Sequence, residues 1–165
     1  MKAFVVYESH WGNTAAIARA IAEGIGPQAR AMFTAEATGE VIASAELIVA
    51  GAPQMGFNLP TEGMLRGIAA DPGKAPAPPD VSHPAMRTWL DGLTRGSCCA
   101  AAFETAGWWS PGSAARPILR KLEAAGYRPI AKPHRFSVHG MYGPLRAGEL
   151  EKAKAWGAEL ARKMR

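Results

Sequence analysis

The sequence has little cysteine and no long apolar run, and each shortage excludes a class of protein. The only two cysteines, Cys98 and Cys99, are adjacent, so in a strand their side chains would point to opposite faces and a disulfide between them would be strained. Two reduced thiols are typical of an intracellular protein. No apolar segment approaches the roughly 20 residues that cross a bilayer, and no basic leader precedes an apolar stretch at the N-terminus. The sequence therefore predicts a soluble, cytoplasmic protein without a membrane span.

Motifs of several chemical classes are also missing. No grouping of His, Cys, Asp or Glu has the spacing of a metal site, and no G-x-S-x-G pattern surrounds Ser9. The net charge is +5, but Lys and Arg are scattered apart from the tail at residues 162–165, and no nucleic-acid-binding motif accompanies them. We therefore expect no metal centre, no serine nucleophile and no nucleic-acid partner. We interpret the positive charge as a bias toward partners with acidic surfaces.

Apolar runs alternate with amphipathic segments along the whole chain. A chain of 165 residues that is 48% hydrophobic can bury one sizeable core, so we expect one domain over residues 1–165. Strands are predicted at residues 3–7, 29–34, 46–51, 98–103 and 128–138. A helical pattern follows each strand. The first is marked by Ile17, Ile21 and Ile25, the second is at residues 39–43, and the third is marked by Met86, Leu90 and Leu93. The fourth runs from Ser113 to Gly126, and the fifth is at residues 149–163, with Leu150 expected to turn inward. Five βα units predict an α/β fold, a parallel sheet with helices on both faces.

One long connection interrupts this alternation. Residues 58–84 are irregular, and residues 71–79 contain too much proline for a helix or a central strand. Residues 61–70 within this excursion could form a helical turn or two. A long connection inside a compact domain is often a lid or a partner surface, but a variable surface excursion is an equally good interpretation.

The most informative segment joins the first strand to the first helix. An apolar run ending at Tyr7 enters a turn rich in hydroxyl and glycine residues, Glu8-Ser9-His10-Trp11-Gly12-Asn13-Thr14, at a helix N-terminus. Free backbone N–H groups and the positive end of the helix dipole meet there, so the turn can hold a phosphate without Lys or Arg. Alternatively, Asn13 or Thr14 simply caps the helix.

Two further loops are expected beside this turn. In a parallel sheet, ligands bind at the carboxyl ends of the strands, and the strands at residues 46–51 and 98–103 end in unusual sequences. The first continues as Ala52-Pro53-Gln54-Met55-Gly56-Phe57, and the second as Glu104-Thr105-Ala106-Gly107-Trp108-Trp109-Ser110.

At these three loops the sequence resembles the flavodoxins and flavodoxin-like flavoproteins, over essentially the whole chain. The resemblance implies a doubly wound five-stranded sheet of order 2-1-3-4-5 and bound flavin mononucleotide (FMN). It implies three groups of cofactor-binding residues: the phosphate loop Ser9, His10, Trp11, Gly12, Asn13 and Thr14; the loop Pro53, Gln54, Met55, Gly56 and Phe57; and the loop Glu104, Thr105, Ala106, Gly107, Trp108 and Trp109.

Individual roles follow from the resemblance. Met55 falls where the family places a bulky side chain against the inner flavin face, and Gly56 where a peptide can turn over to accept a hydrogen bond from N5 of the reduced flavin. Either Trp108 or Trp109 is expected on the outer face. Trp11 departs from the pattern because a small hydroxyl residue often stands there, so one phosphate hydrogen bond is absent or is supplied by His10.

Three functions remain open from the sequence. The first is an FMN-containing electron carrier between redox partner proteins. The second is an FMN-dependent NAD(P)H:quinone-type oxidoreductase in which the proline-rich excursion is a lid. The third is a flavin-free binding module, favoured by Trp11 and by the basic charge.

Overall fold

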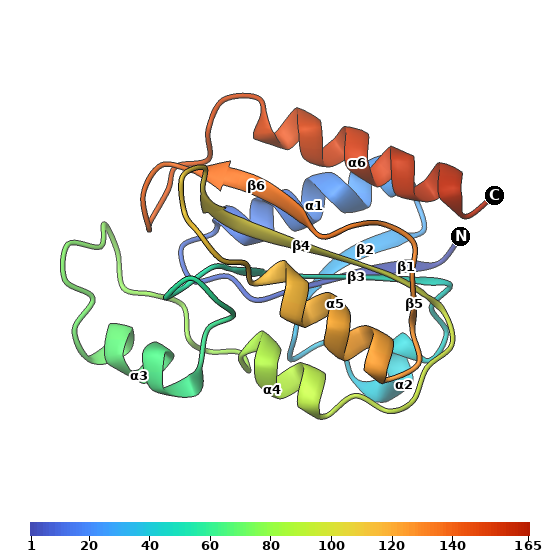
Figure 1. The fold of residues 1–165 in the computed structure, drawn as a ribbon, viewed down its shortest axis with the longest axis horizontal. Coiled ribbons are helices and arrows are strands. Elements are labelled where there is room, and N and C mark those ends of the chain that lie inside the picture. The colour runs from blue at the N-terminus through green and yellow to red at the C-terminus, as the bar shows by residue number, and fades with distance from the viewer.

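A computed structural model describes all 165 residues as alternating strands and helices (Figure 1). The strands are β1 (Ala3–Tyr7), β2 (Ala29–Phe33), β3 (Leu47–Pro53), β4 (Cys99–Gly107), β5 (Arg128–Pro129) and β6 (His134–Val138). The helices are α1 (Asn13–Ile25), α2 (Gly39–Ile42), α3 (Glu62–Ala70), α4 (Met86–Asp91), α5 (Ala115–Ala124) and α6 (Glu149–Lys163).

All the strands pair in parallel in one sheet of order β2-β1-β3-β4-β5, with β6 also paired to β4. Helices α1 and α6 cover one face, and α2, α4 and α5 cover the other (Figure 1). The predicted strand order and the two helical layers are confirmed. The loops that follow β1, β3, β4 and β6 lie at the same end of the sheet, beside α3.

The single last strand predicted at residues 128–138 is wrong, because the structure has two short strands there. β5 pairs with the start of β4, at Cys99 and Ala100, and β6 pairs with its end, from Phe103 onward. Pro129 and Pro133 lie at the interruption and lack the backbone N–H that a continuous ladder needs. The sheet therefore has six strands. β5 and β6 together form its edge, which is the position that the prolines of this segment predict.

Some predicted boundaries also differ. β4 extends to Gly107, so residues 104–107 are strand rather than loop, and β3 extends to Pro53. The bounds of α6 are as predicted, but Leu150 is 44% exposed and does not turn inward. Residues 62–70 form α3, with the Thr61 side chain accepting a hydrogen bond from the N–H of Met64 at 3.2 Å.

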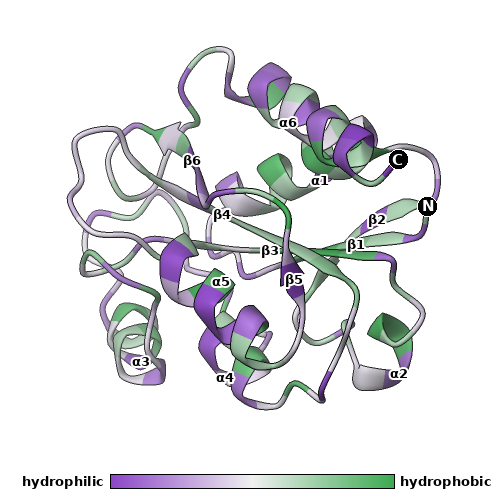
Figure 2. Ribbon diagram, turned by 45° about the vertical axis from the view of Figure 1, so that its right-hand side comes forward, coloured by the Kyte–Doolittle hydropathy of each residue, from purple (hydrophilic) through white to green (hydrophobic).

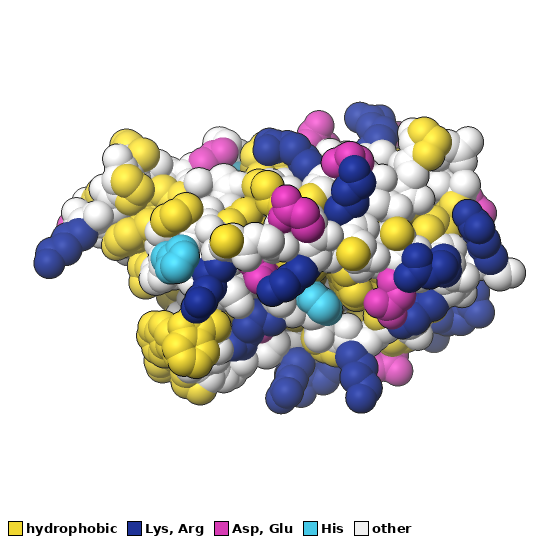
Figure 3. Space-filling model, turned by 90° about the horizontal axis from the view of Figure 1, so that it is seen from above, with side chains coloured by type: hydrophobic (Ala, Val, Ile, Leu, Met, Phe, Trp, Pro, Cys, Tyr) yellow, Lys and Arg dark blue, Asp and Glu magenta, His cyan; other side chains and the backbone are white.

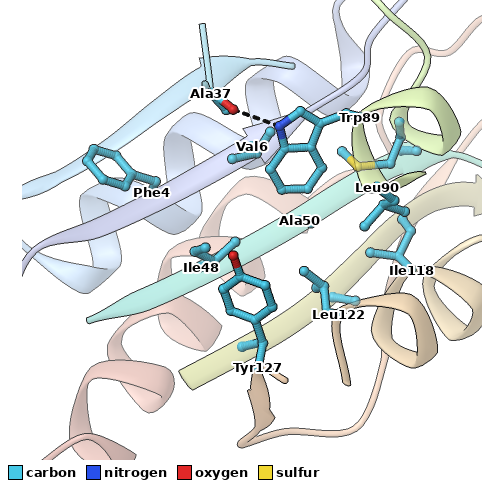
Figure 4. Packing of buried hydrophobic residues seen from close by; sticks show 14 of the residues in the cluster. Phe4, Val6, Ala37, Ile48, Ala50, Trp89, Leu90, Ile118, Leu122 and Tyr127 are labelled. Atoms are coloured by element: carbon cyan, nitrogen blue, oxygen red, sulfur yellow. Dashed lines mark hydrogen bonds between the residues drawn. The ribbon is translucent and has the colours of Figure 1, made fainter. Parts of the chain in front are cut away.

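The core has two layers because successive strand residues point to opposite faces of the sheet. In β1, Val5 packs toward α1 and α6, whereas Phe4 and Val6 pack toward α4 and α5. Figure 4 shows the second layer, in which the Trp89 indole donates a hydrogen bond to the carbonyl oxygen of Ala37 at 2.8 Å. The helices turn their hydrophobic sides to the sheet (Figure 2).

Both cysteines are free, as predicted from their adjacency. Burial raises the pKa of the Cys98 thiol, so this thiol remains protonated at neutral pH. None of the helices combines the length and the apolarity that crossing a bilayer requires.

Helices α1 and α6 approach each other closely because glycine lies at both contact points. A Cβ atom on Gly157 would overlap the carbonyl oxygen of Ile21, and one on Gly24 would overlap that of Lys154. Both obstacles are backbone atoms, which cannot move aside without shifting a helix. This pair of glycines sets the distance between the two helices on that face.

We predict that Gly157→Ala lowers the free energy of unfolding by about 1–3 kcal/mol, because the added methyl group overpacks this contact. Gly67→Ala is the matched control: Gly67 lies in α3 with no atom within 4 Å of its Cβ position. There alanine should raise the stability by up to about 1 kcal/mol through its helix propensity. Urea denaturation of the two variants measures both effects, and equal stabilities would contradict the proposed contact.

Candidate functional site

A cleft of about 370 Å³ opens at the carboxyl ends of the strands. Its walls come from the ends of β3, β4 and β6 and from four loops: the first loop (residues 9–14), the second loop (54–58), the third loop (108–113) and the fourth loop (139–145). Most of the residues predicted from sequence line it: Ser9, Trp11, Asn13, Thr14, Pro53, Gln54, Met55, Gly56, Phe57, Thr105, Ala106, Gly107 and Trp109. The structure thus brings all three predicted loops together around one cavity without a charged side chain in its lining.

The first loop leaves a row of backbone donors open. Gly12 adopts a left-handed conformation with φ of 90°, and α1 then begins without a side-chain cap. The backbone N–H groups from His10 to Thr14 have no partner in the protein, whereas the N–H of Ala15 is satisfied by the Ser9 hydroxyl at 3.2 Å. Open N–H groups at the positive end of a helix dipole favour an anion.

Neither Asn13 nor Thr14 caps the helix, so the alternative interpretation of these residues is wrong. The Asn13 amide donates to the carbonyl oxygen of Tyr142 in the fourth loop at 2.8 Å. The Thr14 hydroxyl lies 2.7 Å from the hydroxyl of Thr105 at the end of β4. Both side chains therefore fasten the first loop to its neighbours.

Hydrogen bonds also join the second loop to the end of β4 and to the third loop. The backbone N–H of Gln54 donates to the carbonyl oxygen of Thr105 at 2.9 Å. The Gln54 side chain donates to the carbonyl oxygen of Pro111 at 2.6 Å. These bonds fix the width of the cleft.

The second loop is a tight turn with a strained residue at its tip. Met55 and Asn58 exchange backbone hydrogen bonds at 2.9 and 3.2 Å. Gly56 and Phe57 between them have φ values of 55° and 63°, as in a type I′ turn. Such a φ at a non-glycine residue costs about 1–3 kcal/mol, and the carbonyl of Phe57 is held against Gly112 of the third loop.

The two adjacent tryptophans have different environments. Trp109 lines the cleft and packs against Gly107, where an added Cβ would lie 3.2 Å from the indole nitrogen. Trp108 lies outside the lining, and the guanidinium of Arg146 is 5.9 Å from the centre of its ring. Both remain exposed, at 67% for Trp108 and 62% for Trp109. Of the two tryptophans, only Trp109 therefore faces the cleft.

Glu104 points away from the cleft. Its buried carboxylate accepts hydrogen bonds from the N–H of Ala115 at 2.9 Å, from the Ser113 hydroxyl at 2.8 Å and from Nε of Arg135 at 2.6 Å. Arg135 in turn donates to the carbonyl oxygens of Ser110 and Gly112, at 2.6 and 2.7 Å. The pair thus satisfies the N-terminus of α5 and holds the third loop in place.

His10 and Gly12 do not line the cleft either. The His10 ring is buried beneath the first loop and bonds to Glu8 and to the backbone of Asp80. It therefore does not supply the side-chain hydrogen bond that Trp11 cannot make. Gly12 shapes the loop through its left-handed conformation.

The sequence predictions missed part of the wall: Ser110, Val138, Gly140 and Met141. Three of these surround His139, in the segment from Val138 to Leu145. Because this segment follows a strand at the same edge of the sheet, the sequence leaves two interpretations: His139 and Tyr142 reach the flavin or a substrate, or the segment is an ordinary entry to a helix. The second interpretation is the one favoured from sequence, and the structure instead places the residues around His139 in the wall of the cleft. The fourth loop returns toward β6 through an isolated bridge between Val138 and Leu145.

Comparisons with known proteins support the fold. No family model matches the sequence, and no curated protein matches it either. Among solved structures, a flavodoxin from the domain Archaea is 22% identical with a TM-score of 0.68, over 99% of each chain. Oxidised flavodoxin 1 from Bacillus cereus is 18% identical with a TM-score of 0.68, over 98% of each chain.

Larger proteins contain the same fold. Rubredoxin oxygen:oxidoreductase from Desulfovibrio gigas is 19% identical with a TM-score of 0.62, over 99% of this chain but only 36% of that one. The similarity thus covers the whole of this chain in proteins of very different length. The chain has the flavodoxin-like fold, as the resemblance at the three loops implied.

We predict that Glu104→Ala lowers the free energy of unfolding by about 3 kcal/mol, because it leaves Arg135 and the first turn of α5 without their buried acceptor. Glu123→Ala, on the exposed side of α5, is the control and should change stability by less than about 0.5 kcal/mol. Thermal or urea unfolding compares the two. A loss of similar size in both variants would show that the carboxylate has no special structural role.

Proposed function

We propose that the protein binds FMN in this cleft and transfers single electrons between redox partner proteins. The observation that supports this most strongly is the row of open backbone N–H groups from His10 to Thr14 at one end of a cleft with apolar walls. Charge-assisted hydrogen bonds from such donors hold a phosphate ester. Two of the similar structures described above are flavodoxins, which agrees with this assignment.

The cleft residues fit the parts of FMN. The first loop would hold the phosphate through its backbone donors and through the Ser9 and Thr14 hydroxyls. Met55 of the second loop and Trp109 of the third loop both line the cleft and would enclose the ring system, which supplies reversible electron transfer when bound. Apolar walls exclude water from the ring, and the turn at Gly56 and Phe57 offers backbone polar groups at its edge.

Exposed apolar side chains at the mouth of the cleft suit a carrier that docks briefly on other proteins. Phe57, Trp108, Trp109 and Met141 are each more than half exposed, and hydrophobic side chains gather at this end of the molecule (Figure 3). Patches of this kind mark sites of protein interaction. The cofactor edge and the docking surface would thus coincide.

The charges near the cleft favour an acidic partner. Arg146 lies beside Trp108, Arg135 supports the third loop, and the carboxylate of Glu104 is buried and paired. The whole chain has a net charge of +5. Long-range attraction of this sign steers association with negatively charged surfaces.

We predict that the purified protein is yellow or takes up one FMN per chain. Ser9→Ala and Thr14→Ala should each raise the dissociation constant for FMN about tenfold, because each removes a hydroxyl from the charged phosphate. Lys74→Ala, in the proline-rich segment away from the cleft, should leave it unchanged. Absorption spectra and fluorescence titration measure these changes.

A colourless protein that does not take up added FMN would defeat the proposal, and an equal effect of Lys74→Ala would contradict the phosphate site. Steady oxidation of NADH or NADPH by the protein alone, with a quinone present, would identify an oxidoreductase rather than a carrier.

We predict opposite salt dependences for two acceptors of the reduced protein. Between about 0.01 and 0.3 M salt, electron transfer to rubredoxin, a small acidic protein, should slow, and transfer to basic cytochrome c should accelerate, because screening weakens attraction and repulsion alike. Arg146→Gln should weaken the salt dependence of electron transfer to rubredoxin. Lys2→Gln removes the same charge at the opposite end of the sheet and should have little effect. Stopped-flow kinetics would expose a reversed pattern, which contradicts the acidic partner.

A further inference from the structure

The end of the proline-rich segment and the residues that follow it are bound to the back of the first loop. We call residues 77–85 the strap. The Trp11 indole donates to the carbonyl oxygen of Ala77 at 2.9 Å, and the N–H of Asp80 donates to the carbonyl oxygen of His10 at 2.8 Å. The N–H of Ser9 donates to Nε2 of His83 at 3.2 Å. Consecutive residues of the first loop therefore each bond to the strap.

The His10 ring lies between two acceptors. Its Nδ1 is 2.7 Å from the carbonyl oxygen of Asp80, and its Nε2 is 2.8 Å from a carboxylate oxygen of Glu8. The side chains of His10 and Glu8 are 1% and 0% exposed, so water cannot substitute for either partner. The second carboxylate oxygen of Glu8 accepts the N–H of Met86, at the start of α4, at 2.6 Å.

The contacts of the His10 ring with the Asp80 carbonyl oxygen and with the Glu8 carboxylate together require one additional proton. A neutral imidazole has one N–H and cannot donate to both acceptors. Both bonds form when His10 is cationic beside an ionised Glu8, or when a neutral His10 receives a hydrogen bond from a protonated Glu8. In either case the pair holds one proton more than a neutral histidine and an ionised carboxylate would.

The groups around His10 are Glu8, the Asp80 carboxylate and His83, whose ring stacks on that of His10 at 5.8 Å. Burial alone would lower the pKa of His10, but its hydrogen bonds to Glu8 and to the Asp80 backbone raise this pKa above its ordinary value. Burial lowers the pKa of His83. Because Nε2 of His83 accepts the Ser9 N–H, His83 is neutral; its Nδ1 atom lies 3.8 Å from the Asp80 carboxylate and has no hydrogen-bond partner.

We propose that the proton shared by Glu8 and His10 is a positioning element that locks the strap onto the first loop and keeps the open N–H groups aligned for a phosphate. This inference rests on the proposed function, in which those groups hold the phosphate of FMN. When the proton leaves, one of the two contacts becomes a repulsion between lone pairs. The remaining ring N–H favours the charged carboxylate of Glu8, so the contact between the His10 ring and the Asp80 carbonyl oxygen is the one lost. Only the bond from the Asp80 N–H to the His10 carbonyl oxygen then holds Asp80, and the loop relaxes.

The sign of the pH effect follows from the direction of the shift. A raised pKa means that the stabilisation is complete below the ordinary pKa of histidine, about 6.5, and is lost as pH rises through the higher folded-state value. The phosphate group of FMN has its second pKa near 6, so above pH of about 7 its own charge no longer changes. Weaker FMN binding at alkaline pH would thus reflect titration of a group other than the phosphate, and the His10→Gln variant tests whether that group is His10.

The experiment compares the dissociation constant for FMN at about pH 7 and pH 9.5, a range above the ordinary histidine pKa, in the wild type, His10→Gln and His134→Gln. The wild type and His134→Gln should bind about tenfold more weakly at the higher pH. His134 is the matched control because its ring stacks on Trp156, away from the cleft. His10→Gln should show no such change, because a glutamine amide does not titrate. Riboflavin, which lacks the phosphate, should show a smaller pH effect than FMN in the wild type.

Nitrogen NMR of the wild-type protein without ligand provides a readout that does not depend on a folded variant. The His10 ring should titrate above the ordinary histidine range and over the same pH interval as the loss of FMN affinity. A pH-independent FMN affinity, or an equal decline in His10→Gln, would overturn the inference while leaving FMN binding intact. Failure to bind FMN at about pH 7, where the phosphate is fully charged, would overturn the proposed function instead.

Discussion

Backbone polar groups at the carboxyl ends of the parallel strands must find partners, and this requirement shapes the whole site. Helices cover both faces of the sheet, so the loops that follow β1, β3, β4 and β6 lie together at one edge. Some of these groups bond across the site: the N–H of Gln54 donates to the carbonyl oxygen of Thr105, and the carbonyl oxygen of Tyr142 accepts from the Asn13 amide. The consecutive N–H groups from His10 to Thr14 have no partner in the protein, and they give the cleft its chemical character.

The elements that the sequence predicts well are those whose environment is uniform. The apolar runs of β1 and β3 are buried on both faces, and α6 repeats its small and apolar residues at helical spacing with a basic last turn. Predictions fail where contacts with residues far away in the sequence determine the local structure. Glu104 and Thr105 have the composition of a loop, yet they continue β4, because Arg135, the start of α5 and Thr14 satisfy their side chains. The break between β5 and β6 follows from two prolines. The sequence shows these prolines, but it does not show that they divide the strand into two separately paired segments.

The site shows the same division. That three loops converge is predictable, because parallel strands place their carboxyl ends together. Which side chains face the cavity is not, because orientation depends on residues far away in the chain. Trp109 faces the cleft and Trp108 faces Arg146, although they are neighbours of the same type. The wall at Gly140 and Met141 depends on a loop that returns to β6, and no local pattern marks that return.

The strap explains two residues of the first loop together. Trp11 departs from the pattern that the resemblance implies, and His10 lies outside the cleft. Trp11 gives up the position of a small hydroxyl residue, but its indole anchors Ala77, and the His10 ring anchors Asp80. The first loop thereby loses a side-chain donor and gains a rigid support behind its backbone donors. Ordering a loop before the ligand arrives lowers the entropy cost of binding. Under the proposed function, a cleft without charged lining residues depends on the alignment of neutral donors for its affinity for a phosphate. The strap that would maintain this alignment then belongs to the binding site although it lies outside the cavity.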